Sequence, residues 1–482
     1  MASVKKNIVL NALNTVTSII FPIITFPYAA RVLLPEGIGT VNFLNGIVAY
    51  IVLLTSLGIP LYAVKEVAKY QNDLYQRNKI TAEILALSFV LCLIGYVAVW
   101  VLAEFVPQIH KQEALFYILS LSILFTAIGV NWFYQGIEDF KFITIRAIII
   151  RTIAAISLFI FVHSPEDLLM YGAIVVFSTV GNNFINFIHL RKYIDLAEIK
   201  LRELNLGKHI KPALQIFILN LIISLYVQLN TIMLGFMAGE EQVGFYTAGT
   251  KIPHIALMLI TSIGTVLLPR CSNLLKEGDI NGFNVLINKS KELTLRLSLP
   301  MMVGLIILAT PTILVFCGDE YRPAIPSLLW NTPIIFFISL STLISIQILY
   351  PMDKINLVII SVSGGAIANI IFNFLLIPQY GATGASISVF ISEFSVLAIQ
   401  LIIARKLIPF SFIQLLPIKL VIATLTMGLG VYASILFVEN SILQLVIGTS
   451  VGILIYFVVL LALRDSLLME TINPLIKRYF SK

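Results

Sequence analysis

The sequence predicts an all-α integral membrane protein, and three observations support this fold class. The 482 residues are 59% hydrophobic and 12% charged, whereas ordinary soluble domains carry about 25% charged residues. Apolar runs long enough to cross a bilayer succeed one another along the whole chain. Lysine and arginine gather in alternate connections between these runs. Because a hydrocarbon core of about 30 Å needs about 20 apolar residues per helix, we expect about fourteen transmembrane helices.

The expected helices follow from the apolar runs in chain order. They cover residues 7–34, 41–68, 80–103, 113–136, 142–163, 168–190, 212–238, 244–269, 292–316, 324–350, 355–377, 381–404, 413–437 and 441–463. The last run contains no charged residue, whereas prolines interrupt the first run and the tenth.

The positions of lysine and arginine predict that both termini are cytoplasmic. With the N-terminus inside, most of the 32 Lys and Arg residues fall in cytoplasmic segments, and the outer turns hold only Lys111 and Arg322. Positive residues favour the cytoplasmic side of a membrane. The net charge of +7 is then mainly a topology signal, and it does not indicate nucleic-acid binding, which requires a basic soluble face.

The connections between the helices also limit the function. Every expected outer connection is short, for example PEGIG and PQYGAT, which disfavours polymerases and glycosyltransferases because these need a sizeable outer loop or domain. The longest inner link, Arg191 to Lys211, mixes apolar residues with charges. It is predicted to lie along the membrane surface as an amphipathic helix that joins two halves.

The two halves resemble each other in sequence. Aligning Glu36 in LLPEGIGTVNF with Glu241 in GEEQVGFYTAG also pairs Gly39 with Gly244. Both copies begin at the outer end of a helix that started inside, which predicts two parallel-repeat lobes around a central cavity that alternates its access. The expected organisation is an N-terminal lobe at 1–195, a cytoplasmic amphipathic linker at 196–211, a C-terminal lobe at 212–405, and two additional helices with a cytoplasmic tail at 406–482.

Five basic residues inside the expected spans are the candidate substrate-binding residues. They are Arg31, Arg146, Arg151, Lys251 and Arg296. An ionised side chain inside the bilayer is costly unless it faces a cavity or a partner. Snorkelling to lipid headgroups is the alternative for Arg31, Arg146 and Arg296, which lie near helix ends, whereas Arg151 and Lys251 lie deeper. A cavity lined by these cations would attract an anion.

Acids and amides are rarer in the spans. Glu393 lies near the middle of one span, either as a proton carrier or as a permanent partner of a basic residue. Two asparagine pairs at i,i+4 spacing, Asn182 with Asn186 and Asn369 with Asn373, place amides on one helix face. Hydrogen bonds between helices are one interpretation, and a sugar or ion contact is the other. Aromatic residues at span ends are predicted to anchor the membrane interface, namely Trp132, Phe133, Tyr134, Tyr246 and Tyr350.

Four segments carry a resemblance to a known family. ARVLLPEGIGTVNF, SLGIPLYAVKEVAK, NWFYQGIEDFKFITIR and NIIFNFLLIPQYGATGASIS resemble the recurring segments of the Wzx-type polysaccharide flippases, within the multidrug/oligosaccharidyl-lipid/polysaccharide (MOP) exporter superfamily. The similarity covers essentially the whole chain. It implies a multi-pass protein of the bacterial inner membrane, with a V-shaped pair of lobes around a central cationic cavity.

The resemblance also implies a function. The chain is expected to be a flippase, and not an enzyme, that moves undecaprenyl-diphosphate-linked oligosaccharide, such as an O-antigen or capsule repeat unit, from the inner to the outer leaflet. Its partners would be the lipid-linked glycan, membrane lipids and polysaccharide polymerase or assembly proteins. The alternative is an ion-coupled small-molecule (drug) exporter of the same superfamily.

No cofactor or metal is expected. Cys92, Cys271 and Cys317 are far apart in sequence and imply neither a disulfide framework nor a metal site. No Gly-rich phosphate loop ending in Gly-Lys-Ser/Thr occurs, so direct use of ATP is not expected. Either an H+ or Na+ gradient supplies the energy, or transport runs downhill as the product is removed. Glu393 is the proton candidate. Asn369, Asn373 and Thr383 are the sodium candidates, because they flank an outer turn where the related lipid II flippases bind sodium.

The turn after the first helix has two interpretations. Arg31 would end the first helix on the cavity side, Pro35 and Gly37 would form the outer turn, and Gly39 with Asn42 would let the next helix return in close packing. The turn is interpreted either as a movable outer gate or as a simple helical hairpin.

Overall fold

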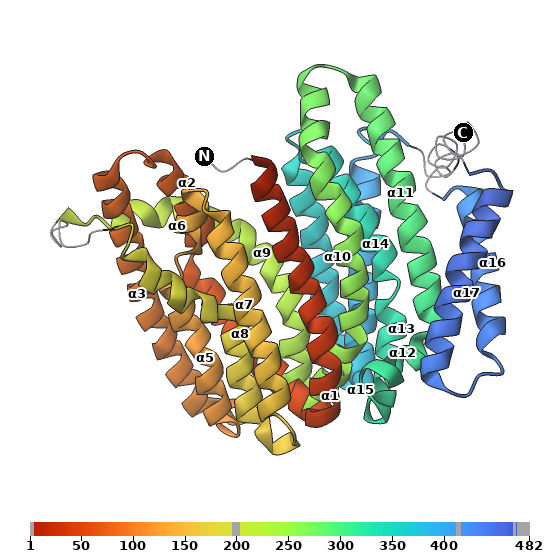
Figure 1. Cartoon of the computed structure of the whole chain (residues 1–482), viewed down its shortest axis with the longest axis horizontal. Coiled ribbons are helices and arrows are strands. Elements are labelled where there is room, and N and C mark those ends of the chain that lie inside the picture. Colours follow the sequence, from red (N-terminus) through yellow and green to blue (C-terminus); the bar gives the residue numbers. More distant parts are fainter. Residues whose placement is uncertain (1–3, 195–202, 411–415, 466–468, 470–482) are drawn as a thin grey trace, which may run out of the picture. The chain divides into compact units, whose positions relative to one another are not determined.

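All regular elements of the described chain are helices. A computed structural model describes residues 4–194, 203–410, 416–465 and 469 (Figure 1), and its elements confirm the predicted all-α class. Contacts divide the chain into two units, residues 1–244 and 245–482. The predicted lobe boundaries follow the sequence repeat and stay a prediction. Residues 196–202 of the predicted amphipathic linker lie outside the described residues.

The first unit contains α1 to α9 and the beginning of α10. The bounds are α1 (Val4–Ser56), α2 (Ile59–Lys69), α3 (Leu74–Phe105), α4 (Pro107–His110), α5 (Glu113–Ala127), α6 (Asn131–Gly136), α7 (Phe140–Phe161), the 3₁₀ turn η1 (Pro165–Asp167), α8 (Leu168–Leu190), α9 (Gly207–Ala238) and α10 (Glu240–Lys276).

The second unit contains the remainder of α10 and the later helices. The bounds are α11 (Ile280–Ile307), α12 (Ala309–Phe316), the 3₁₀ turn η3 (Asp319–Ala324), α13 (Ile325–Asn331), α14 (Ile334–Thr342), the π-helical segment η4 (Leu343–Leu349), α15 (Ile355–Ile403), α16 (Ile418–Ile435) and α17 (Ser441–Ala462).

Membrane-spanning helices account for most of both units. Among the described residues, 10 helices are long and apolar enough to cross a membrane, or 11 if the bent pair α11 and α12 forms one span. At 1.5 Å per residue, α1 and α15 would each reach about 75 Å, more than twice the hydrocarbon thickness. Both contain a break, at Leu34 (φ 61°) and Gly381 (φ 51°). The breaks fall where the sequence predicted outer turns. The count of about fourteen spans and the cytoplasmic location of both termini stay predictions.

Side-chain caps mark the start of the helices that carry polar residues of interest. The Asp139 carboxylate accepts from the Phe142 N–H at 3.2 Å at the start of α7. The Asn440 side chain accepts from the Ile442 N–H at 2.9 Å at the start of α17. Asp and Asn satisfy N–H groups that the first helical turn leaves without partners, so the local sequence determines where both helices begin.

The aromatic run of α6 forms part of the core of the first unit. Trp132 is 5% exposed, and Phe133 and Tyr134 are fully buried. They pack in one cluster with Tyr62 and Ile84 of neighbouring helices. The predicted role of these three residues as interface anchors is therefore wrong, because their rings are covered by protein.

The outer turn of α1 packs against the beginning of α10, within the first unit. A Cβ atom on Gly39 would overlap the Glu240 carbonyl oxygen and lie 2.8 Å from the Gly244 backbone nitrogen, and a Cβ atom on Gly244 would overlap the Pro35 carbonyl oxygen. The contact is reciprocal, because Pro35 and Glu240 are equivalent in the predicted repeat, as are the two glycines. The Thr40 hydroxyl donates to the Glu240 carboxylate at 3.1 Å. Gly39 is closely packed, as predicted, but the three nearest atoms belong to α10 and not to the helix before the outer turn.

Alanine in place of Gly39 or Gly244 is expected to destabilise the protein, because a backbone oxygen cannot move aside as a flexible side chain can. Overpacking costs about 1–3 kcal/mol, so thermal unfolding of the purified protein should shift to lower temperature in both variants.

The matched control is Gly304→Ala on α11, because the nearest atom to a Cβ at that position is 4.0 Å away. Alanine there should be neutral or stabilising. Equal unfolding temperatures for all three variants and the unaltered protein would contradict the close backbone packing at Gly39 and Gly244.

Candidate functional site

Arg146 of α7 is held in the first unit by asparagine side chains. Its NH2 group donates to Asn131 Oδ1 at 3.0 Å, and its Nε donates to Asn182 Oδ1 at 3.3 Å. The guanidinium lies 4.9 Å from the Phe142 ring centroid, and the residue is 6% exposed. Amide oxygens stabilise a buried cation through their dipoles but do not cancel its charge.

The asparagine side chains also bond to one another between helices. Asn186 Nδ2 donates to Asn131 Oδ1 at 2.8 Å, and Asn131 Nδ2 donates to Asn183 Oδ1 at 3.3 Å. These bonds join α6 to α8 and confirm the interpretation of the Asn182 and Asn186 pair as interhelical hydrogen bonding. Asn131, which the sequence did not single out, is the centre of this cluster.

Arg151 lines a separate cavity of about 330 Å³ between α1, α7 and α8. We call it the hydroxyl cavity, because its polar lining consists of Ser18, Thr25, Arg151, Tyr171, Ser178, Thr179 and Asn182. Arg151 NH1 donates to the Thr17 hydroxyl at 3.0 Å. No Asp or Glu of the described chain lines the cavity, so its surroundings favour a neutral polar or anionic ligand.

Asn182 connects the two arginines of α7. Its side chain accepts from Arg146 and also lines the hydroxyl cavity with Arg151. Arg146 and Arg151 therefore have neighbouring environments although their spacing places them on different helix faces. Arg31 is exposed on α1 and lies about 21 Å along that helix from Thr17, at 1.5 Å per residue.

The remaining sequence candidates of α10 and α15 lie in the second unit. Lys251 is half-buried on α10, and Glu393 is 6% exposed on α15. Asn373 Nδ2 donates to Asn369 Oδ1 at 3.2 Å within the first half of α15, and Thr383 is half-buried just beyond the Gly381 break. Their predicted roles in substrate binding and ion coupling stay predictions.

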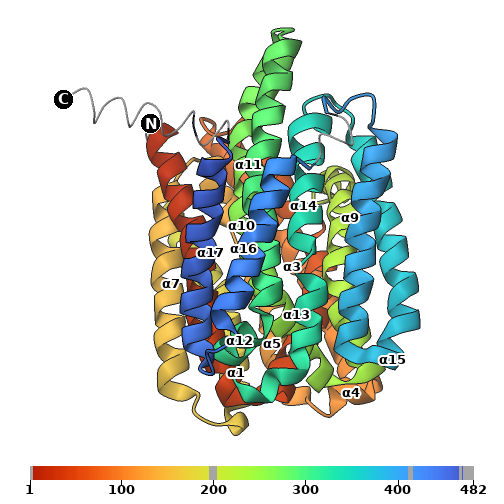
Figure 2. The same cartoon turned by 90° about the vertical axis from the view of Figure 1, so that its right-hand side faces the viewer.

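In the second unit, α16 and α17 pack against α11 and α12 (Figure 2). A larger groove, which we call the terminal groove, lies between these helices. Its volume is about 810 Å³. From Leu286 to Leu305 it follows α11 for about 28 Å, comparable to the hydrocarbon thickness. Its lining is mostly apolar and includes Met301, Leu305, Met427, Ile453 and Leu460.

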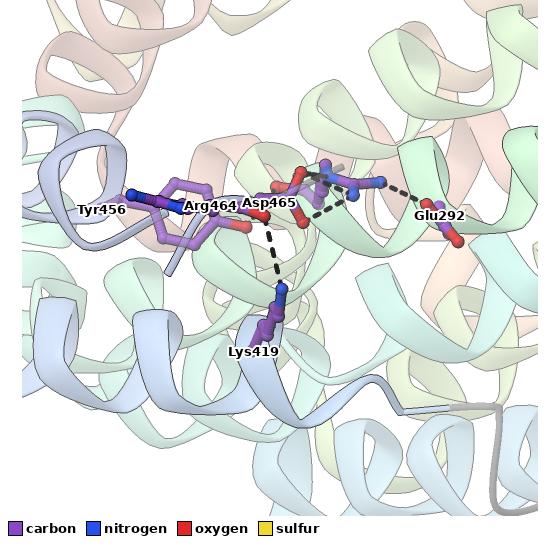
Figure 3. Close-up of polar contacts among 6 residues, drawn as sticks. Glu292, Lys419, Tyr456, Arg464 and Asp465 are labelled. Atoms are coloured by element: carbon purple, nitrogen blue, oxygen red, sulfur yellow. Dashed lines mark hydrogen bonds and ion pairs between the residues drawn. The ribbon is translucent and has the colours of Figure 1, made fainter. Parts of the chain in front are cut away.

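The cationic residues of the terminal groove are Lys289 and Arg296 of α11. Arg296 pairs with Asp465, which lies just beyond the end of α17 (Figure 3). The Arg296 NH2 group donates to both Asp465 carboxylate oxygens at 2.7 Å, and its Nε donates to Oδ1 at 3.0 Å. Its NH1 group donates to Glu292 at 3.2 Å. The Arg296 and Asp465 side chains are 11% and 5% exposed, so this ion pair is largely removed from water.

Sequence reasoning did not identify Lys289, Glu292 and Asp465 as parts of a site. Glu292 precedes Arg296 by one helical turn, a spacing that predicts an ion pair. Asp465 is an acid directly after the last apolar run, in a segment where the rule for cytoplasmic charges predicts basic residues. Only the first signal predicts a partner from spacing alone.

We expect Arg146→Ala to destabilise the protein more than Arg151→Ala. Removing Arg146 leaves the buried Asn182 oxygen without its donor, and an unsatisfied buried polar group costs about 1–3 kcal/mol. Arg151 is half-buried beside a cavity, so its loss should change stability by less than about 1 kcal/mol.

Thermal unfolding of the two purified variants measures this difference. A larger loss for Arg151→Ala would contradict the assignment of Arg146 as the structurally embedded cation.

Comparisons with known proteins agree with this architecture. The family model described as "Polysaccharide biosynthesis protein" matches residues 4–275. The chain is similar to the "Putative O-antigen transporter" of Escherichia coli (strain K12), with 26% identity over 413 residues that cover 84% of this chain and 97% of that protein. It is also similar to the "Capsular polysaccharide biosynthesis protein CapF" of Staphylococcus aureus, with 26% identity over 75% of this chain and 89% of that protein.

Solved structures share the fold. The "Lipid II flippase MurJ, inward closed conformation" matches with a TM-score of 0.76 and 18% identity, over 95% of this chain and 99% of that chain. An inward-facing multidrug resistance MATE family transporter of the MOP superfamily matches with a TM-score of 0.62 and 13% identity, over 80% and 93% of the two chains. The predicted MOP-type fold is therefore confirmed.

The family match extends over more than half of the 482 residues, and the helices long enough to cross a membrane recur throughout the described chain. The chain is thus a multi-pass membrane protein, of the inner membrane in bacteria, and it belongs to the polysaccharide biosynthesis protein family.

Proposed function

We propose that the chain is a flippase, and not an enzyme, that moves an undecaprenyl-diphosphate-linked oligosaccharide from the inner to the outer leaflet for O-antigen or capsule assembly. The observation that carries this proposal is the terminal groove, which combines a long apolar surface with cations. Relatives named as an O-antigen transporter and a lipid II flippase support the same substrate class. Polysaccharide polymerase or assembly proteins would then receive the translocated unit.

The groove has the chemistry needed for a polyprenyl diphosphate. Its volume of about 810 Å³ lies toward the upper end of the usual range for ligand sites, about 300–1,000 Å³. A polyprenyl chain would gain about 25 cal/mol for each Å² of apolar surface that it buries there. Arg296 would bind phosphate oxygens in a bidentate way, and Lys289 would act as a point charge.

The glycan requires polar contacts, and the hydroxyl cavity of the first unit offers them. Its hydroxyl and amide groups suit sugar hydroxyls, and Arg151 suits an acidic sugar or phosphate. Of the five predicted cations, we assign Arg31, Arg151, Lys251 and Arg296 to direct contact with the diphosphate and glycan during transport. The fifth, Arg146, acts indirectly by orienting Asn182 at the cavity wall.

Cells that lack the gene should accumulate lipid-linked repeat units on the inner leaflet and lose surface polymer, and the unaltered gene should restore the polymer. Arg151→Ala should restore it poorly, because loss of one charge-assisted hydrogen bond of about 1.5–3 kcal/mol lowers affinity by about tenfold to a hundredfold. Arg151→Lys should restore part of it. Thr17→Val is the control, since it removes one hydrogen-bond partner of Arg151 and leaves the charge of Arg151 in place.

Two experimental outcomes would contradict this function and indicate another one. If membranes without the protein failed to synthesise the lipid-linked unit, the chain would be an enzyme of its synthesis. If surface polymer were unchanged and resistance to drugs fell on deletion, the chain would be a small-molecule exporter of the same superfamily.

We further propose that an ion gradient drives transport, with Glu393 as the proton carrier. A carboxyl that is 6% exposed inside a span can take up and release a proton as the water around it changes. In liposomes with a labelled lipid-linked oligosaccharide, a proton gradient should accelerate transport, and Glu393→Gln should remove that acceleration while leaving downhill equilibration.

A sodium gradient is the alternative driving force. If sodium and not protons accelerated transport, Asn369→Ala and Thr383→Ala should remove the effect, and Glu393 would lose its proposed role. Equal rates with either gradient or none would leave facilitated equilibration as the mechanism.

A further inference from the structure

The end of α17 places Asp465 against Arg296 through a defined backbone turn. Arg464 has φ 47°, in the left-handed region. Its N–H donates to the Leu461 carbonyl, and the Asp465 N–H donates to the Leu460 carbonyl, both at 3.0 Å. These two bonds form a Schellman motif, which ends the helix and reverses the chain. The backbone therefore holds Asp465 in position independently of its carboxylate.

Two further hydrogen bonds stabilise the end of α17 and its contact with α11. Lys419 Nζ of α16 donates to the Arg464 carbonyl at 3.3 Å (Figure 3). The Tyr456 hydroxyl donates to the Arg296 carbonyl at 3.1 Å. Neither contact involves the Asp465 carboxylate. A change of that carboxylate to an amide thus alters the charge at Arg296 while these backbone contacts persist.

Among the described residues, the carboxylates that pair with Arg296 match the cations that line the terminal groove. Lys289 and Arg296 carry two positive charges, and Glu292 and Asp465 carry two negative charges. Asp465 uses both oxygens on the Arg296 guanidinium, which is the geometry that a phosphate group would adopt there. In this arrangement Asp465 occupies the position of a bound phosphate.

The groove needs such a balance because it is open to lipid. Ile453 and Phe457 of α17 line it and are 56% and 49% exposed. Membrane phospholipids vastly outnumber any lipid-linked glycan, and the anionic phospholipid phosphatidylglycerol carries one phosphate with a single negative charge. An unbalanced Arg296 at the edge of an apolar groove would attract these phospholipids as well as the diphosphate.

We propose that Asp465 is a specificity-determining residue: it competes with lipid phosphate for Arg296, so that a lipid diphosphate displaces it and a lipid with one phosphate does not. The inference rests on the proposed function, because it assigns a selection step to the same groove. A lipid with one phosphate replaces the carboxylate at Arg296 but reaches no second cation, so it gains little. A diphosphate brings a second phosphate group, which reaches Lys289 two helical turns from Arg296 on α11.

The test measures lipid occupancy of the full-length purified protein by native mass spectrometry. The probes are phosphatidylglycerol, undecaprenyl monophosphate and undecaprenyl diphosphate, each titrated separately. The quantity compared is the ratio of affinities for the diphosphate and the monophosphate, which does not depend on the fraction of protein that is folded. The variants are Asp465→Asn, Asp465→Glu and Asp319→Asn.

The unaltered protein should prefer the diphosphate to the monophosphate by about tenfold or more, and Asp465→Asn should reduce the preference to about threefold or less by raising monophosphate and phosphatidylglycerol binding. Asp465→Glu should keep the preference, because it keeps the charge. Asp319→Asn should also keep it. Asp319 is the matched control, since it pairs with Arg322 at 3.0 Å in an exposed ion pair away from the groove.

Two results for Asp465→Asn would overturn the proposal and leave Asp465 as a purely structural partner of Arg296. One is an unchanged ratio of diphosphate to monophosphate affinity, and the other is a proportional loss of binding for all three lipids. The proposed function fails separately, if the unaltered protein shows no preference for undecaprenyl lipids over phosphatidylglycerol. In that case competition by Asp465 still stands if Asp465→Asn raises phosphatidylglycerol occupancy, and it falls if occupancy is unchanged.

Discussion

An arginine side chain inside a membrane protein requires polar partners, since hydrocarbon offers none. The described part of this chain meets the requirement in two chemically different ways. Arg146 is surrounded by asparagine amides, which stabilise the cation by dipoles and leave its charge uncancelled. Arg296 is paired with the carboxylates of Asp465 and Glu292, which cancel it. The choice of partner decides how each site responds to an anion.

The two solutions would suit different tasks in the proposed transport of an anionic lipid-linked glycan. Around Arg146 and Arg151, positive charge remains beside a cavity lined by hydroxyl groups, so an anionic or sugar-rich ligand meets no competing carboxylate of the described chain there. In the terminal groove, a ligand must compete with Asp465 before it reaches Arg296. The first arrangement favours capture, and the second favours selection.

Backbone packing at the outer turns constrains the scaffold that carries these groups. Gly39 and Gly244 allow the two copies of the repeated segment to meet at backbone distance, with Pro35 and Glu240 in reciprocal positions. A contact of this kind has no flexible side chain to absorb a displacement. Any movement of these outer turns must therefore shift both segments together. The two interpretations of the turn after the first helix, a movable gate and a fixed hairpin, differ only in whether that shift occurs.

The sequence by itself determined the features that depend on local pattern. Apolar run length and the positions of charges predicted the all-α membrane class and the outer turns near Leu34 and Gly381. The alignment of the two halves identified Gly39 and Gly244, and i,i+4 spacing identified the Asn182 and Asn186 pair. These properties could be read from the sequence because helix periodicity and bilayer thickness act on neighbouring residues.

Only the tertiary structure decided which distant groups meet. Asp465 follows Arg296 by 169 residues, and no periodic pattern links them. Trp132 looked like an interface anchor because span ends in membrane proteins are rich in aromatic rings, yet neighbouring helices cover it. The partner of a buried charge and the burial of an aromatic ring both depend on how separate helices pack, and packing is a property of the whole fold that local spacing does not encode.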